Sequence, residues 1–148
     1  MLASADTTKP NTNSTQVSLG SQADVKTVGD VAHGLLFEGT TSELVSVEYA
    51  SGSNTYQAWS GRPAAAAVTL DSGVEIATID IDSEGRMWLA SDASTSIHVR
   101  YSDPPYSTWS APIVLATGVS SDDISVVTAM PNGTIGVRGT QFLVEVDG

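Results

Sequence analysis

Short runs of alternating apolar and polar residues dominate the chain, and few windows show the spacing of an amphipathic helix. The runs are rich in Val, Ile, Thr and aromatic residues. Gly, Asn, Asp, Ser and Pro separate them, which is the pattern of short β-strands joined by turns. We therefore predict an all-β protein.

The middle of the chain predicts the clearest set of strands. Val74 begins a run that lasts to Ile81, and a turn follows at residues 82–85. Further strands are expected at residues 86–90, 96–101 and 111–116. Four antiparallel strands within about fifty residues are typical of one blade of a β-propeller.

Similar sets of strands precede and follow this one. The earlier set is predicted at residues 24–32, 35–38, 43–49 and 64–70. The later set is predicted at residues 123–130, 134–138 and 142–146, with a hairpin turn at Asn132-Gly133. That set is one strand short. Residues 14–20 precede the first set just as the fourth strand of one set precedes the first strand of the next. We therefore predict that this N-terminal strand closes the last blade.

Aromatic residues mark the repeat. Tyr49 and Tyr101 are about fifty residues apart, as are Trp59 and Trp109, and such a period indicates a repeat architecture. We predict a flexible leader at residues 1–13 and one β-repeat domain at residues 14–148. Its repeats cover residues 24–72, 73–122, and 123–148 together with 14–20.

Three blades are too few for a ring, because propellers have about four to eight. We therefore predict a homo-oligomer in which two chains form a six-bladed ring. A piece of a longer propeller and a plain sandwich are the alternatives.

The amino-acid composition limits the classes of partner that the protein is expected to bind. The 148 residues include 17 acidic and 6 basic side chains, which give a net charge of −11 spread along the sequence. This charge repels phosphate backbones and anionic lipid, so neither nucleic acid nor a membrane is expected as a partner. The absence of cysteine excludes disulfides and thiol chemistry. No signal peptide or membrane-spanning run is visible. The localisation stays open, and an extracellular location or a virion surface fits these features.

Residues 97–112 resemble the Asp-box repeat of sialidase-type propellers. Ser102, Asp103, Thr108 and Trp109 supply the residue types of that motif, although Asp103 follows Ser102 directly and Pro104-Pro105 stands where a glycine is usual. The resemblance implies a folding device, in which the Asp binds turn amides and the Trp packs within the blade. We expect Trp59 and Trp109 to have this structural role.

Catalysis is not expected. Sialidase chemistry, as the resemblance implies, needs three clustered arginines, a tyrosine nucleophile with a glutamate, and an aspartate acid/base. The chain has four arginines at scattered blade positions, and no segment matches the catalytic motifs. His33 and His98 have no partner at metal-ligand or triad spacing in the sequence.

The predicted architecture also resembles oligomeric lectins built from tandem blades, which hold sugars between blades with an Arg, an acidic residue and a Trp. Equivalent third-strand positions here read Glu48, Arg100 and Glu145, so one repeated sugar site is not expected. We predict at most one site per chain. Its residues are Trp88, Arg86, Arg100 and Tyr101.

Acidic residues at alternate positions in Asp80-Ile-Asp-Ser-Glu-Gly85 suggest Ca²⁺ ligands, with Asp80, Asp82 and Glu84 supplying the oxygens. An EF-hand loop would end in a bidentate Glu, but Ser91 occupies that position. A hairpin turn with acids facing water is therefore the favoured interpretation. No other cofactor is implied.

Taken together, these patterns predict a non-catalytic, self-associating β-propeller module that binds carbohydrate. One alternative is a structural or assembly protein of a virion or cell surface without a small-molecule ligand. A second alternative is a fragment of a propeller enzyme similar to glycoside hydrolases. Fold alone does not decide among them, because propellers host many unrelated activities.

Overall fold

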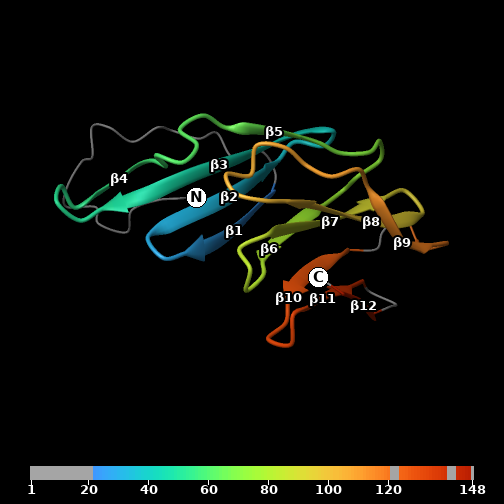
Figure 1. Cartoon of the computed structure of the whole chain (residues 1–148). Helices are drawn as coiled ribbons and strands as arrows, with labels where there is room; N and C mark the ends of the chain where they lie inside the picture. Colours follow the sequence, from blue (N-terminus) through green and yellow to red (C-terminus); the bar gives the residue numbers. More distant parts are fainter. Residues whose placement is uncertain (1–21, 121–123, 140–142, 148) are drawn as a thin grey trace.

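The computed structural model describes residues 22–120, 124–139 and 143–147, and all regular structure within these ranges is β-strand (Figure 1). The strands form antiparallel sheets of three to five strands, which confirms the all-β prediction. The predicted leader at residues 1–13 and the predicted closing strand at residues 14–20 lie outside the described residues.

The first sheet has four strand positions, the last of which is split. Its strands are β1 (Gln22–Val28), β2 (Val31–Phe37), β3 (Thr41–Ala50), β4 (Thr55–Ala58) and β5 (Ala66–Thr69). β4 pairs with residues 47–50 of β3, and β5 pairs with residues 41–44 on the same edge. Residues 59–65 therefore interrupt what would otherwise be a single fourth strand.

The second and third sheets are simple antiparallel meanders. The second contains β6 (Ala77–Ile81), β7 (Met87–Ala93), β8 (Ser96–Ser102) and β9 (Ile113–Thr117) in that order. The third contains β10 (Val126–Ala129), β11 (Thr134–Arg138) and β12 (Leu143–Asp147). The bounds of β11 match the predicted strand, and β8 ends one residue later than predicted.

The strand predicted at residues 24–32 is wrong, because the chain reverses within it. Val28 of β1 pairs with Val31 of β2, so Gly29 and Asp30 form a two-residue turn. Gly29 has φ +56°, a left-handed conformation that glycine adopts without a steric penalty. The strand β4 was not predicted at all, because its exposed residues lack an apolar face.

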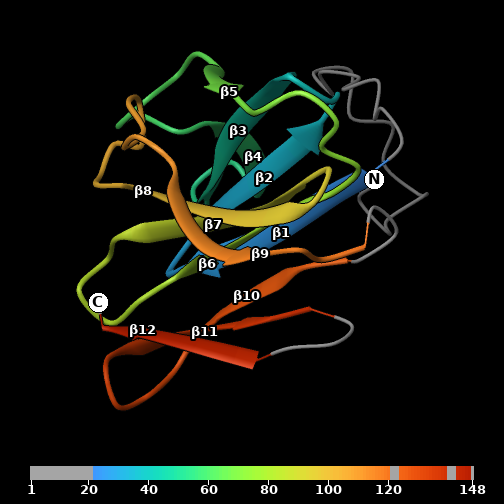
Figure 2. The ribbon, with the colours of Figure 1, turned by 90° about the vertical axis from the view of Figure 1, so that its right-hand side faces the viewer.

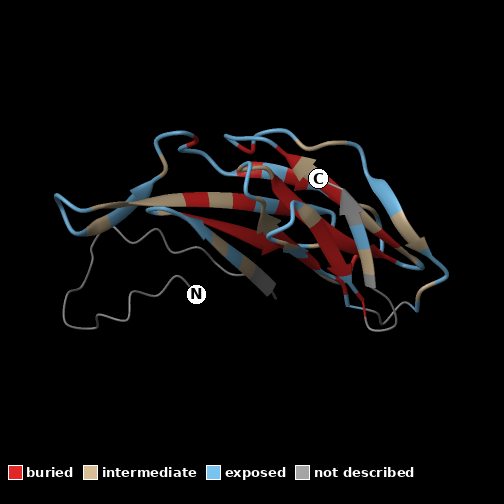
Figure 3. Cartoon of the chain, turned by 60° about the horizontal axis from the view of Figure 1, so that its bottom comes forward, coloured by how far each residue is buried: buried red, intermediate tan, exposed pale blue. Residues whose placement is uncertain are grey.

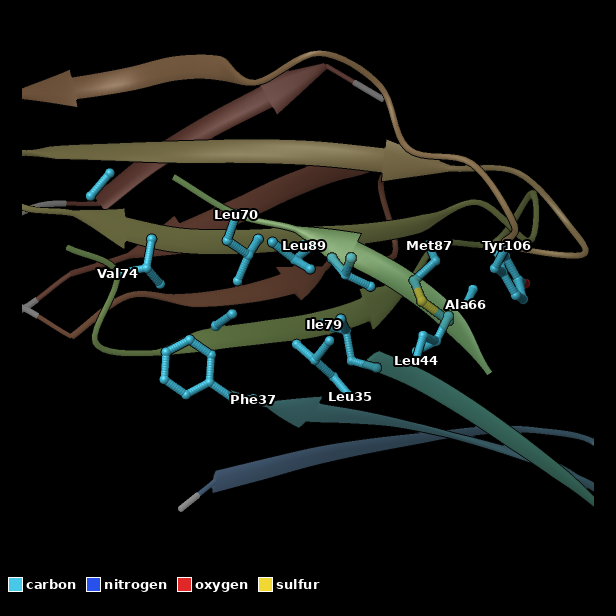
Figure 4. Packing of buried hydrophobic residues seen from close by; sticks show 13 residues of the cluster. Leu35, Phe37, Leu44, Ala66, Leu70, Val74, Ile79, Met87, Leu89 and Tyr106 are labelled. Atoms are coloured by element: carbon cyan, nitrogen blue, oxygen red, sulfur yellow. The ribbon is translucent and has the colours of Figure 1, made fainter. Parts of the chain in front are cut away.

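Each pair of neighbouring sheets encloses a hydrophobic cluster. The first cluster lies between the first and second sheets and includes Leu35, Leu44, Ile79 and Leu89 (Figure 4). The second cluster lies between the second and third sheets and includes Trp88 from β7 and Ile135 from β11. Both faces of β7 are therefore covered, and all seven of its residues are buried. Figure 3 shows that buried positions gather along the strands in the middle of the molecule.

The first strands of the three sheets are neighbours in space. β6 contacts β1 on one side and β10 on the other (Figure 2). Polar bonds reinforce these contacts: Asp24 on β1 accepts a hydrogen bond from the Ile79 amide at 2.8 Å. Thr78 Oγ1 on β6 accepts one from the Val127 amide at 3.0 Å. Within the described residues the sheets form an open row and do not close into a ring.

Candidate functional site

Three of the four residues predicted to bind a ligand come together on the second sheet. Trp88 on β7 pairs directly with Tyr101 on β8, and their ring centroids are 5.4 Å apart. Arg86, just before β7, places its guanidinium carbon 4.5 Å from the centroid of the Tyr101 ring. This is cation–π geometry, which orients the guanidinium over the aromatic ring.

Trp88 packs against Tyr101 from the interior and is too buried to contact a ligand. The residue is 3% exposed and packs in the second hydrophobic cluster. Its indole Nε1 donates a 2.8 Å hydrogen bond to Asp82 Oδ2, which satisfies the buried donor. Trp88 therefore fixes the position of Tyr101 but offers no open ring face to a sugar.

Arg100 does not belong with the other three predicted residues. Successive residues of a strand point to opposite faces of the sheet, so Arg100 and Tyr101 diverge. Arg100 is buried, and its Nη2 donates to Asp71 Oδ2 at 2.8 Å. This aspartate follows β5 in the connection between the first two sheets.

A groove runs along the loop that follows β8. Its volume is about 360 Å³, and it is lined by Tyr101, Ser102, Asp103, Pro104, Pro105, Ser107, Thr108, Trp109 and Ser110. Side-chain bonds hold the loop: Ser102 Oγ donates to the Thr108 carbonyl at 2.6 Å, and the Tyr106 hydroxyl donates to the Gly85 carbonyl at 2.7 Å. Hydrogen bonds from side chains of the loop thus hold the wall of the groove in place.

Asp103 links the groove to Arg86. Arg86 Nε donates to Asp103 Oδ1 at 2.8 Å, and Nη2 lies 3.5 Å from Oδ2. The Asp103 side chain is 61% exposed. The hydrogen bond that Arg86 donates to Asp103 raises the pKa of Arg86 above its usual value, so the guanidinium stays charged at the rim. In the Asp-box motif this carboxylate would bind turn amides; here it binds an arginine.

The two tryptophans that are about fifty residues apart, Trp59 and Trp109, have structural contacts. Trp59 and Trp109 are partly buried, and both pack against the first hydrophobic cluster. The Trp59 ring also lies 5.2 Å from the His33 ring, nearly perpendicular to it. Trp109 additionally lines the groove, so it serves the core and the groove wall together.

The acidic turn forms a hairpin in which the carboxylates of Asp80 and Asp82 already accept hydrogen bonds. Asp82 Oδ1 accepts hydrogen bonds from the Glu84 and Arg86 amides, and Oδ2 accepts the Trp88 indole. Asp80 Oδ2 accepts a bond from the Ala129 amide on β10. Among the described residues, no group of three His, Cys, Asp or Glu side chains is arranged to hold a metal ion.

Two further constellations were not found in the sequence. A smaller cavity of about 190 Å³ lies on the first sheet, beside the cross-strand pair Tyr49 and Tyr56 and the turn residue Asp30. The second constellation joins Ser96, His98 and Asp71 by hydrogen bonds. Alternation along β8 already places Ser96 and His98 on one face, but Asp71 is distant in sequence.

Comparisons with known proteins add no family. The sequence matches no protein-family model, and no curated protein matches it at a significant level. Within the described part of the chain, no helix has the length and apolarity needed to cross a membrane.

Proposed function

We propose that this chain binds carbohydrate in the groove of residues 101–110. The observation that carries the proposal is the Arg86–Asp103 pair beside Tyr101 at the groove. Sugars offer apolar C–H faces and hydroxyl groups. Aromatic side chains pack on those faces, while charged groups bind the hydroxyls.

The groove supplies both kinds of surface. Tyr101 and Trp109 contribute aromatic wall, and Asp103 contributes a hydrogen-bond acceptor. Arg86, which is bonded to Asp103, adds donors beside the groove. An exposed ion pair of this kind contributes only about 0–1 kcal/mol, so sugar hydroxyls can exchange with it at small cost. A volume of about 360 Å³ fits the lower end of small-molecule sites, which corresponds to one or two sugar rings.

Calorimetric titration with a panel of neutral and acidic sugars tests this proposal. We expect one site per chain, and we expect Asp103→Asn to weaken binding by about tenfold because a charge-assisted hydrogen bond is lost. Asp30→Asn is the matched control, since it removes the same charge at the smaller cavity. Unchanged binding in Asp103→Asn with loss in Asp30→Asn would move the site to that cavity. No binding of any sugar at millimolar concentration would overturn the proposal.

A second proposal concerns assembly. We propose that two chains associate into a six-bladed ring, with residues 14–20 supplying the strand that follows β12. The row of three sheets and the position of β12 at the edge of the third sheet support it. The first strands of the two outer sheets also expose apolar side chains, Val25 on β1 and Val126 on β10.

Light scattering on the full chain tests the assembly. We expect twice the monomer mass of 15.3 kDa, and we expect a chain lacking residues 1–20 to lose the dimer. A monomer in solution would overturn the two-chain ring. A dimer that binds no sugar would leave the structural role as the function of the chain.

A further inference from the structure

Ser96, His98 and Asp71 form a continuous hydrogen-bonded relay. His98 Nδ1 lies 2.8 Å from Asp71 Oδ2, and His98 Nε2 lies 3.0 Å from Ser96 Oγ. Ser96 and His98 are two residues apart on β8, so their side chains share one face of the sheet. The order of atoms, hydroxyl to Nε2 and Nδ1 to carboxylate, is that of a serine nucleophile with its base and orienting acid.

The hydrogen bonds to Asp71 determine which ring nitrogen of His98 carries the proton. Asp71 accepts hydrogen bonds from both His98 and Arg100 on the same oxygen. The bond from His98 is the main cause that lowers the pKa of Asp71, so the carboxylate is ionised near neutral pH. An ionised carboxylate only accepts, so Nδ1 must donate its hydrogen. In the neutral imidazole, Nε2 is then a free base facing the Ser96 hydroxyl.

The relay is open to a reactant at its serine end. Ser96 is half-buried, and the hairpin residues Ser94 and Thr95 before it are exposed. The base is more protected, because the His98 side chain is 14% exposed. The relay lies at the start of β8, whereas Tyr101 and the groove lie at its end. The two sites can therefore be tested independently.

We propose that Ser96 is a nucleophile that takes an acyl group from small esters, with His98 as its general base and Asp71 as the positioning residue. Ser96 Oγ bonds to the ester carbonyl carbon while its proton passes to His98 Nε2. The carbon–oxygen bond to the leaving alcohol breaks, and that alcohol takes the proton. Water then attacks the acyl carbon while His98 Nε2 takes one of its protons. The bond between that carbon and Oγ breaks, Oγ takes the proton from His98, and a carboxylic acid leaves.

The Ser96 hydroxyl has a second hydrogen-bond acceptor besides His98. Ser96 Oγ also lies within hydrogen-bond distance of the Ala93 carbonyl, at 3.2 Å. The donor is therefore shared between Ala93 and His98. General-base catalysis raises reaction rates by about 10²–10⁴-fold. We expect the relay to acylate Ser96 faster than an isolated serine hydroxyl by a factor in this range.

Incubation of the full chain with p-nitrophenyl acetate tests the proposal by two readouts. Release of nitrophenolate measures the rate, and peptide mass spectrometry locates the acetyl group. We expect the adduct on Ser96, no adduct there in Ser96→Ala, and a rate about 10²–10⁴-fold lower in His98→Gln. Ser53→Ala is the control, because Ser53 bonds Thr55 and the Ala50 carbonyl and should react like wild type.

Thermal unfolding separates a chemical role from a structural one. Ser96→Ala leaves the His98 and Arg100 bonds to Asp71 intact, so its midpoint should stay close to that of wild type while acylation is lost. Acetylation spread over several surface residues at equal rates would overturn the proposal. An unchanged rate in a folded Ser96→Ala variant would overturn it as well.

Discussion

The buried guanidinium of Arg62 joins the first two sheets by donating from Nε to the carbonyl oxygen of Pro105 at 3.0 Å. Its Nη1 donates to the carbonyls of Leu44 and Ala64, and its Nη2 donates to Ser46 Oγ at 2.6 Å. These four acceptors are neutral, and burial lowers the pKa of Arg62. One side chain thus ties the loop at residues 59–65 to β3 and to the wall of the groove.

We predict that Arg62→Met lowers the free energy of unfolding by about 2–5 kcal/mol, because several buried acceptors lose their donor at about 1–3 kcal/mol each. Urea denaturation measures the change. Arg138→Met is the matched control: it removes the same charge from an exposed position on β11 and should change stability by at most about 0.5 kcal/mol. Equal losses in both variants would show that charge, and not the bonds of Arg62, is responsible.

The contact between the second and third sheets gives a further prediction. Asp80 Oδ2 accepts a 2.8 Å hydrogen bond from the Ala129 amide, and Lys26 lies 3.8 Å from Oδ1. Asp80→Ala should cost about 1.5–3 kcal/mol and should speed hydrogen exchange at the Ala129 amide. Glu84→Ala is the matched control, because it removes the same charge from an exposed position in the turn that follows β6. Faster exchange at Ala129 in the Glu84 variant would contradict this assignment.

Local patterns predicted the strands that pack on a sheet neighbour. β7, β8 and β11 were found because clear turn residues bound their apolar runs, as Gly85 does before β7 and Gly133 does before β11. The turn at Gly29-Asp30 was missed because apolar residues continue on both sides of it. The exposed strand β4 was missed because pairing with β3, and not burial, determines it. Such pairing depends on tertiary context.

The candidate site also contains parts that the sequence predicts and parts that depend on tertiary context. Pairing of two correctly predicted strands brings Trp88 to Tyr101, so that part followed from the sequence. The period of two along β8 was enough to place Arg100 on the other face. The link from His98 to Asp71 was not predictable, because it depends on how the connection between two sheets crosses β8.

Calcium should leave the melting temperature unchanged. Both oxygens of Asp82 accept hydrogen bonds from nitrogen donors in the folded chain, so a cation would compete with these donors for the same oxygens. Differential scanning calorimetry with and without millimolar CaCl₂ measures this, because a ligand of the folded state raises the midpoint. MgCl₂ at the same ionic strength is the control. A rise specific to calcium would restore Asp80, Asp82 and Glu84 as ligands.

The buried imidazole of His33 should make stability depend on pH. Burial, and then the charge of Arg62, lowers the pKa of His33 from 6.5 to about 4. The unfolded chain therefore binds more protons between these two values, and stability falls as the pH drops through that range. Each unit corresponds to about 1.4 kcal/mol, so the total loss is on the order of 3 kcal/mol. Above about pH 6.5 this contribution is fully present.

Urea denaturation of wild type and His33→Gln at several pH values checks this dependence. The amide of Gln stays neutral throughout and offers a hydrogen-bond partner to Ser46, which lies 2.8 Å from His33 Nδ1. Between about pH 6.5 and 5 the variant should lose little stability, because carboxyl groups titrate mostly below this range. Hydrogen bonding lowers the pKa of both Asp71 and Glu48, so their contributions disappear at still lower pH in both proteins. Parallel curves above about pH 5 would show that His33 does not carry the dependence.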